Sequence, residues 1–150
     1  MSHSYRSHFF HLIWSTKNRE PWLTKNLCPP LYKYIGGILR DVKINLVEIG
    51  GIENHVHLLL EVSNPENYFS MIRQVKAGSS RWINGEFPQP VRFAWQEGYG
   101  SFSVSYSQIP VLVKYIQTQE EHHRERTFEM EMEMFLSKHH IAYDKRYVFG

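Results

Sequence analysis

Residues 53–62 are ENHVHLLLEV, in which one valine separates His55 from His57 and three leucines follow. Side chains alternate between the two faces of a β-strand, so a strand here places both imidazoles on one face, roughly 7 Å apart along the chain. The other face is almost wholly apolar and needs a cover, which we expect to consist of helices. Two convergent imidazoles begin a metal site, and a third ligand has to come from elsewhere in the chain.

A simpler interpretation of this pair is that both are ordinary strand histidines. In that case one is partly exposed and the other is satisfied by a hydrogen bond. A His-x-His pattern is short and arises often, so the pair alone does not establish a metal site. The decision depends on which other residues accompany it.

The composition is that of a folded globular chain, and we expect one domain over residues 1–150. A length of 150 residues is close to the commonest domain size. Hydrophobic residues make up 42% and aromatic residues 15%, which argues against disorder. The net charge of +2 excludes the strongly basic, histone-like class but permits a local basic patch.

Cys28 is the only cysteine, which excludes an intrachain disulfide and a cysteine-rich zinc site and favours a reducing compartment. The apolar run at residues 9–14 is too short to span a membrane and lacks a small-residue cleavage site. We therefore expect a cytoplasmic protein with no membrane partner.

Hydrophobic periodicity and turn residues predict the order strand, helix, strand, strand, helix, strand and then helices. The expected segments are a strand over 5–16, a helix over 27–40, a strand over 43–50 closed by Gly50-Gly51 and paired with the His strand, a helix beginning at 64–66, a loop over 85–101, a strand over 102–106, a helix from Pro110 through His123, a last helix over about 127–139 and a tail over 142–150.

This order matches an α+β fold, the ferredoxin-like split βαβ sandwich with an antiparallel sheet. Right-handed crossovers place the two early helices on one face of the sheet. The opposite face is then free for the His pair, with the later, tyrosine-bearing helix packed against it.

Tyr115 and Gln119 lie four residues apart on that later helix, and His122 follows on the same side. A helical tyrosine usually belongs to a core or an interface. A phenol can also act as a nucleophile when a metal polarises the electrophile. Two imidazoles and an amide oxygen form an open three-ligand site suited to Mg²⁺ or Mn²⁺ and a phosphate oxygen.

Five segments occur in a fixed order over nearly the whole chain: WSTKNR at 14–19, HVHLLL at 55–60, WQEGYGSFSVS at 95–105, YIQTQ at 115–119 and QEEHHR at 119–124. Together they resemble the single-tyrosine transposases of the IS200/IS605 insertion-sequence family, which carry a histidine-hydrophobe-histidine motif and a tyrosine helix. The pair of histidines alone is a weak signal, whereas the combination is specific.

The resemblance implies cleavage of single-stranded DNA at hairpin-bearing element ends, through a covalent 5′-phosphotyrosine intermediate and with a divalent metal, Mg²⁺ or Mn²⁺. It assigns Tyr115 as the nucleophile and His55, His57 and Gln119 as metal ligands, with His122 as an alternative third ligand by geometry. It also implies a homodimer in a bacterial or archaeal cell, in which one subunit's tyrosine helix can complete the other subunit's site.

Three basic residues lie off the apolar stripe of the helix that begins at 64–66, and they are candidates for DNA contacts: Arg73, Lys76 and Arg81. The alternative is a solvated helix flank. Aromatic residues of the glycine-rich segment either stack on bases or pack in the core: Trp95, Tyr99 and Phe102. Glutamates make the last helix acidic, so we expect this surface to face solvent or a subunit rather than DNA: Glu129, Glu131 and Glu133.

Three competing functions remain open. A domesticated relative would process chromosomal hairpins by the same chemistry. A silent DNA-binding regulator would have a broken ligand set or lack the tyrosine, and neither is missing here. A metal-dependent phosphodiesterase would use water as its nucleophile and form no covalent adduct.

Overall fold

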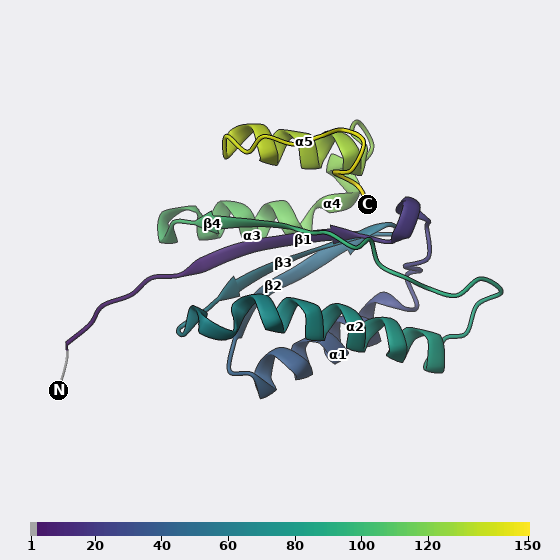
Figure 1. Cartoon of the computed structure of the whole chain (residues 1–150), viewed down its shortest axis with the longest axis horizontal. Helices are drawn as coiled ribbons and strands as arrows, with labels where there is room; N and C mark the ends of the chain where they lie inside the picture. Colours follow the sequence, from purple (N-terminus) through teal and green to yellow (C-terminus); the bar gives the residue numbers. More distant parts are fainter. Residues whose placement is uncertain (1–2) are drawn as a thin grey trace.

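The computed structural model describes residues 3–150 (Figure 1). A 4-stranded antiparallel sheet with the order β2-β3-β1-β4 forms its centre. The strands are β1 (Phe9–Ser15), β2 (Asn45–Ile52), β3 (His55–Glu61) and β4 (Gly100–Val104). The helices are α1 (Cys28–Asp41), α2 (Tyr68–Glu86), α3 (Ile109–Gln117), α4 (Gln119–His122) and α5 (Phe128–Lys138).

The layers agree with the expected sandwich. Helices α1 and α2 cover one face of the sheet, and α3, α4 and α5 lie on the other (Figure 1). The predicted α+β, ferredoxin-like arrangement is confirmed, including the placement of the tyrosine-bearing helix across the sheet from the two early helices.

The apolar face of β3 is covered as its alternation predicts. Val56, Leu58 and Leu60 are buried in the larger core together with Leu31 and Ile35 of α1. Burying each such side chain contributes about 1.5–3 kcal/mol. This anchoring sets the alternation of β3, so the histidines have to point to the other side of the sheet.

The hairpin between β2 and β3 is confirmed, but its turn lies later than expected. Gly50 and Gly51 belong to β2 and pair with His57 and Val56, so they do not close the strand. A Cβ atom on Gly50 would lie 2.7 Å from the carbonyl oxygen of Ile116. Glycine here therefore allows the backbone of α3 to dock directly on β2.

The single helix expected from Pro110 through His123 is wrong, because the chain breaks at Thr118. This residue has φ −113° and ψ 34°, and it separates α3 from α4. Its hydroxyl donates to the carbonyl of Lys114 at 2.8 Å, a local side-chain bond that competes with regular helix. Gln119 therefore begins a new short helix.

A smaller core lies under α5, on the side of the sheet that faces the histidines. It contains Ile13 of β1, Phe102 of β4 and the apolar face of α5, and Val148 and Phe149 of the tail pack against it. In the part of the chain that the structure describes, residues 3–150, no helix is long and apolar enough to cross a membrane.

Candidate active site

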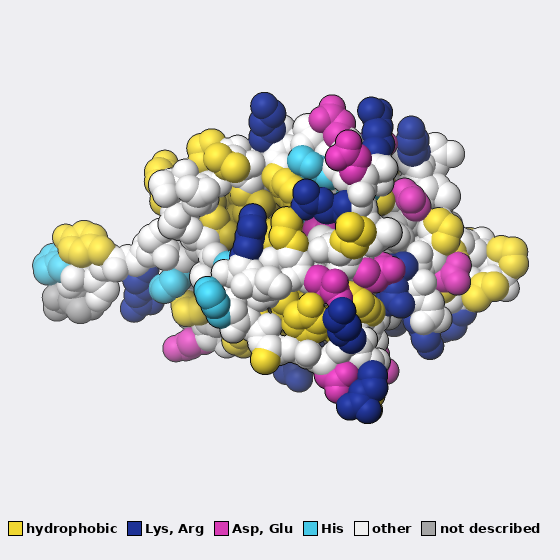
Figure 2. All heavy atoms as spheres, turned by 90° about the horizontal axis from the view of Figure 1, so that it is seen from above, with side chains coloured by type: hydrophobic (Ala, Val, Ile, Leu, Met, Phe, Trp, Pro, Cys, Tyr) yellow, Lys and Arg dark blue, Asp and Glu magenta, His cyan; other side chains and the backbone are white. Residues whose placement is uncertain are grey.

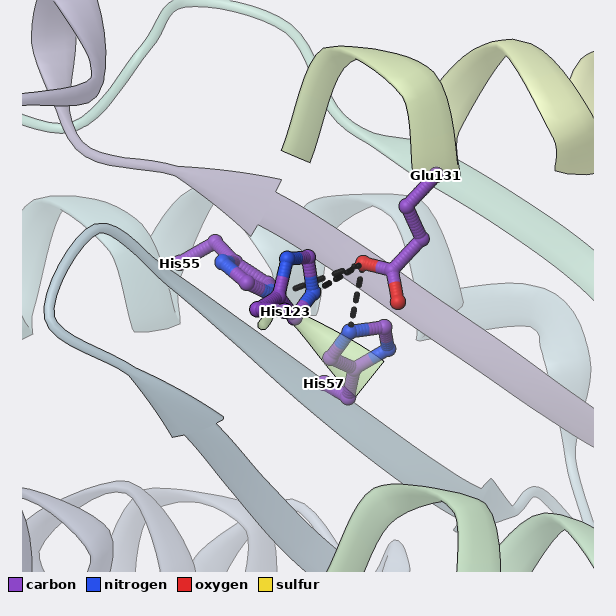
Figure 3. A group of neighbouring side chains, drawn as sticks. All are labelled: His55, His57, His123 and Glu131. Carbon is purple, nitrogen blue, oxygen red and sulfur yellow. Dashed lines mark hydrogen bonds and ion pairs between the residues drawn. The ribbon is translucent and has the colours of Figure 1, made fainter. Parts of the chain in front are cut away.

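Strand β3 presents His55 and His57 toward α5, and both side chains are fully buried. Their Nε2 atoms converge on one carboxylate oxygen, Oε1 of Glu131, at 3.3 Å from His55 and 3.0 Å from His57 (Figure 3). The two imidazoles therefore share one focus, as the alternation of the strand predicts.

Gln119, the predicted third ligand, lies at the same focus. Its side-chain oxygen is 3.0 Å from Nε2 of His55. Its amide nitrogen donates to the backbone carbonyl of Tyr115 at 3.2 Å. This second bond fixes the amide so that its oxygen faces the histidines.

Tyr115, the predicted nucleophile, reaches the cluster from α3. Its hydroxyl donates to Oε2 of Glu131, and its ring lies 5.8 Å from that of His57. Burial, followed by the neighbouring Glu131 carboxylate, raises the pKa of the phenol. The four residues that the sequence proposed as nucleophile and ligands thus lie together within one chain.

His122, the alternative ligand, does not face the other histidines. Its Nε2 is 3.1 Å from the hydroxyl of Thr118, and its ring stacks on Tyr115 at 4.5 Å. The neighbouring residue His123 enters the site instead, 3.1 Å from the Gln119 oxygen and 3.3 Å from Glu131. His123 follows Gln119 by four residues, and its backbone N–H donates to the Gln119 carbonyl at 3.0 Å, so helical spacing places both side chains on one face.

The expectation that the acidic surface of α5 faces solvent or a subunit is wrong for Glu131, which is fully buried at the centre of the cluster. Burial on its own would raise the pKa of this carboxyl. Hydrogen bonds from His123, His55 and His57 outweigh that effect and hold the pKa well below its usual range. Helical spacing carried a signal for this placement, since Glu131 lies three residues after the buried Phe128 and one before the buried Met132.

His11 is a second residue that the sequence did not single out. It is buried on β1, and its Nε2 lies 2.7 Å from Nδ1 of His57. The bond leaves Nε2 of His57 directed at Glu131, in the way outer partners orient metal-binding histidines. Burial, followed by the charge of His57, lowers the pKa of His11, and burial lowers the pKa of His55 to about 4. Neutral imidazole is the form that binds metal ions.

The donor set fits a divalent cation. Ligand atoms of His55, His57, His123 and Glu131 all lie within 4.8 Å of one another. Neighbouring ligands in a tetrahedral site are about 3.4 Å apart when the metal–ligand bonds are about 2.1 Å. The separations of 3.0–3.3 Å around Glu131 Oε1 are close to that value, so an ion can be accommodated after small movements.

The basic residues proposed for DNA contacts lie away from this cluster. The Lys76 ammonium donates to the backbone carbonyls of three consecutive residues, Gln96, Glu97 and Gly98, at 2.7–2.9 Å. Arg73 and Arg81 are exposed on α2, across the sheet from the histidines (Figure 1). DNA contacts by these residues stay a prediction, and the donors of Lys76 are already in use within the chain.

The aromatic residues of the glycine-rich segment divide between the two interpretations. Trp95 is buried, and its indole donates to the hydroxyl of Ser79 at 2.9 Å. Phe102 is buried in the smaller core, whereas Tyr99 is 39% exposed. Core packing therefore accounts for Trp95 and Phe102.

Comparison with known proteins agrees with this geometry. Residues 4–119 match the family model described as "Transposase IS200 like". The ISDra2 transposase TnpA of Deinococcus radiodurans is 24% identical over 115 residues, which cover 73% of this chain and 82% of that protein.

Two solved structures share the fold. One, a transposase candidate from Deinococcus radiodurans, is 26% identical with a TM-score of 0.63 and covers 79% of this chain and 96% of its own. The other is a REP-associated tyrosine transposase bound to a REP hairpin, 16% identical with a TM-score of 0.62, covering 82% and 74%. With a family match over most of its length, and with the motifs of that family gathered around one buried cluster, this chain belongs to the IS200-like transposases.

Proposed function

We propose that this transposase cleaves and rejoins single-stranded DNA at hairpin-bearing ends, with Tyr115 as the nucleophile that forms a 5′-phosphotyrosine intermediate. The observation that carries the proposal is the meeting of the Tyr115 hydroxyl with His55, His57 and Gln119 around one buried carboxylate. A tyrosine with a purely structural role does not require two histidines and a glutamine around its hydroxyl.

A divalent ion, Mg²⁺ or Mn²⁺, is the proposed cofactor. His55, His57 and Gln119 would hold it, with His123 and Glu131 as further donors. When bound, such an ion supplies positive charge that neutralises phosphate oxygens. The number of imidazoles favours Mn²⁺ over Mg²⁺, because Mg²⁺ prefers sites built from oxygen ligands.

The residues of the chain provide the remaining chemistry. Attack of the Tyr115 oxygen on phosphorus forms one P–O bond and breaks the bond to the 3′-oxygen, so bond energy is retained and a 3′-hydroxyl can later reverse the step. The phenol must lose its proton as it attacks. Its hydrogen bond to Oε2 of Glu131 orients the hydroxyl, while the low pKa of this carboxyl disfavours keeping the proton there. The 3′-oxygen takes up a proton as it leaves, which balances the exchange.

Hairpin DNA is the proposed partner, and a solved protein of the same fold is described as bound to a REP hairpin. A homodimer also remains part of the proposal. Because Tyr115 and the two strand histidines meet within one chain, the arrangement described here needs no second subunit to bring these groups together.

A denaturing gel after incubation with labelled hairpin-bearing single-stranded DNA and Mn²⁺ tests the proposal. The wild-type protein should form a DNA adduct that survives denaturation, and Tyr115→Phe should form none while its Kd for DNA stays within about twofold. Tyr106→Phe is the matched control, because Tyr106 is 75% exposed and lies off the cluster. An adduct formed by Tyr115→Phe would overturn the assignment, and cleavage without any adduct would favour attack by water.

A further inference from the structure

A groove runs from Tyr115 along the outer side of the sheet, between α3 and α5, with β4 as its floor. Its volume is about 380 Å³. Figure 2 views this face and shows hydrophobic side chains gathered in a hollow on it. The residues that form its apolar wall and inner end are Phe102, Phe135, Leu112, Val111, His11 and Tyr115.

Aromatic contacts connect the groove to the nucleophile without a gap. The Phe135 ring meets Tyr115 edge to face at 6.0 Å and lies nearly parallel to Phe102 at 5.5 Å. Phe102 in turn lies 4.7 Å from the ring of His139 at an angle of 30°. Phe102 is buried by these contacts, so the rings open to a ligand are those of the half-buried Phe135 and the exposed His139, and a flat aromatic ligand can stack on them.

Polar groups border this apolar wall. Strand β4 ends the sheet of the described residues, so the groove floor includes a strand edge that pairs with no other strand. Ser103, Ser105 and Gln108 add side-chain donors and acceptors, and the exposed Lys138 adds positive charge at the rim. This combination suits a ligand with flat apolar faces, polar edges and an attached negative charge.

We propose that the groove binds one nucleobase of the DNA strand, that of a nucleotide adjoining the phosphate that Tyr115 attacks. The inference rests on the proposed strand-cleavage function and adds a site for substrate recognition to it. Pockets for small organic ligands range over roughly 300–1,000 Å³. The volume of about 380 Å³ is near the lower end of that range, so the groove accepts a base and not a duplex.

The position of the groove beside Tyr115 allows one base to enter it. When a phosphate lies against Tyr115 and the histidines, the nucleotides on either side of it lie within one nucleotide's length of the Tyr115 hydroxyl. Tyr115 borders both features: its ring lies 5.8 Å from that of His57, and the same side chain lines the groove. A base that stacks there also fixes the strand in one register, which selects the bond that is attacked.

Equilibrium binding of the full chain to single-stranded hairpin DNA, with EDTA to prevent cleavage, tests the site. One nucleotide at a time is replaced by an abasic residue. At a single position we expect the affinity of the wild-type protein to fall roughly 5- to 150-fold, the range that stacking of one base on aromatic side chains supports. In a parallel cleavage reaction, that position should adjoin the bond that is cut.

Ser103→Trp fills the groove from an exposed position on its floor, and Ser105→Trp does so from the rim. Each variant should bind intact DNA more weakly and lose its sensitivity to the abasic position. Ser70→Trp, exposed on α2 and outside the groove, should behave as the wild type. If either filled variant keeps its fold and still shows the full abasic penalty, the proposal is overturned.

The same experiment separates the two proposals. In one outcome, binding depends on a single base, filling the groove abolishes that dependence, and the protein never forms a DNA adduct. This outcome would refute strand cleavage and leave a base-binding groove. In the other outcome, the protein forms an adduct, but no abasic position lowers its affinity for DNA, or the one that does lies remote from the cut. This outcome would refute base binding in the groove and leave the strand-cleavage chemistry.

Discussion

Replacing Gly50 by alanine tests whether the docking of α3 on β2 sets the position of Tyr115, the proposed nucleophile. The added Cβ would lie 2.7 Å from the carbonyl oxygen and 3.0 Å from Cγ2 of Ile116. Ordinary contacts begin at 3.4 Å, so α3 has to retreat by about 0.7 Å, the difference between 3.4 and 2.7. Overpacking of this kind typically costs about 1–3 kcal/mol of unfolding free energy.

The effect on catalysis should exceed the effect on stability. Ile116 follows Tyr115 directly and lies three residues before Gln119, so the retreat displaces both from the histidines of β3. Misplacement of a reacting group by ~1 Å can cost about 10²-fold in rate. For the smaller shift we expect adduct formation under single-turnover conditions to slow by roughly 10- to 100-fold.

Gly37→Ala in α1 is the matched control. Apart from its own helix backbone and chain neighbours, no atom lies within 4 Å of the Cβ that this change adds, and alanine is favoured over glycine in a helix by about 0.8–1 kcal/mol. The control should retain its rate and gain slightly in Tm. A Gly50→Ala protein that is destabilised but cleaves at the wild-type rate would refute the idea that this contact positions Tyr115.

Three further predictions concern metal, pH and the basic residues. Mn²⁺ at about 100 times its Kd should stabilise the protein by about 2.7 kcal/mol and raise Tm by roughly 5–10 °C. A His55→Ala, His57→Ala double variant should lose this Tm shift in calorimetry. A chelator should stop cleavage by the wild-type protein. Burial lowers the pKa of His55 from 6.5 to about 4 in the folded state. The contribution of the neutral imidazole to stability is therefore fully present above pH 6.5 and is lost as the pH falls toward 4. Denaturant titration of the metal-free protein should show a loss of about 1 kcal/mol at pH 5.5 from this residue, and a free energy of unfolding that does not fall would contradict this expectation. Lys76→Met should cost about 1.5–3 kcal/mol of stability, because three carbonyls lose a charged donor. If Arg73 and Arg81 contact phosphates, Arg73→Ala and Arg81→Ala should each reduce the slope of log affinity for single-stranded DNA against log salt concentration by about 0.7.

Alternation and periodicity were sufficient to predict the layers of the fold. The leucines of β3 require a cover on one side only, and the apolar stripes of α1 and α2 supply it. Once that face is buried, the direction of His55 and His57 follows from the geometry of a strand. These predictions succeed because each depends on one element and a repeating pattern.

The site was predicted only in part, since its centre depends on contacts between elements. The break at Thr118 depends on a local hydrogen bond that periodicity does not reveal. His123 rather than His122 faces the cluster, a placement for which the spacing of four residues from Gln119 carried a signal. Gly50 looked like a strand end, but its lack of a side chain serves the close approach of α3. Glu131 was assigned by its charge to a solvated surface, although its helical phase places it among buried residues.

Helix α5 has a consequence for how the site of this chain can be altered. The family match ends at residue 119, so α5, with Glu131, lies beyond the shared segment that carries the strand histidines and Tyr115. The segment that carries the strand histidines and Tyr115 and the helix that carries Glu131 are therefore separate pieces of chain. We expect that replacing α5 in this chain would change the hydrogen bonding of Tyr115 and His57 while leaving both residues in place, which makes this helix a suitable target for protein engineering.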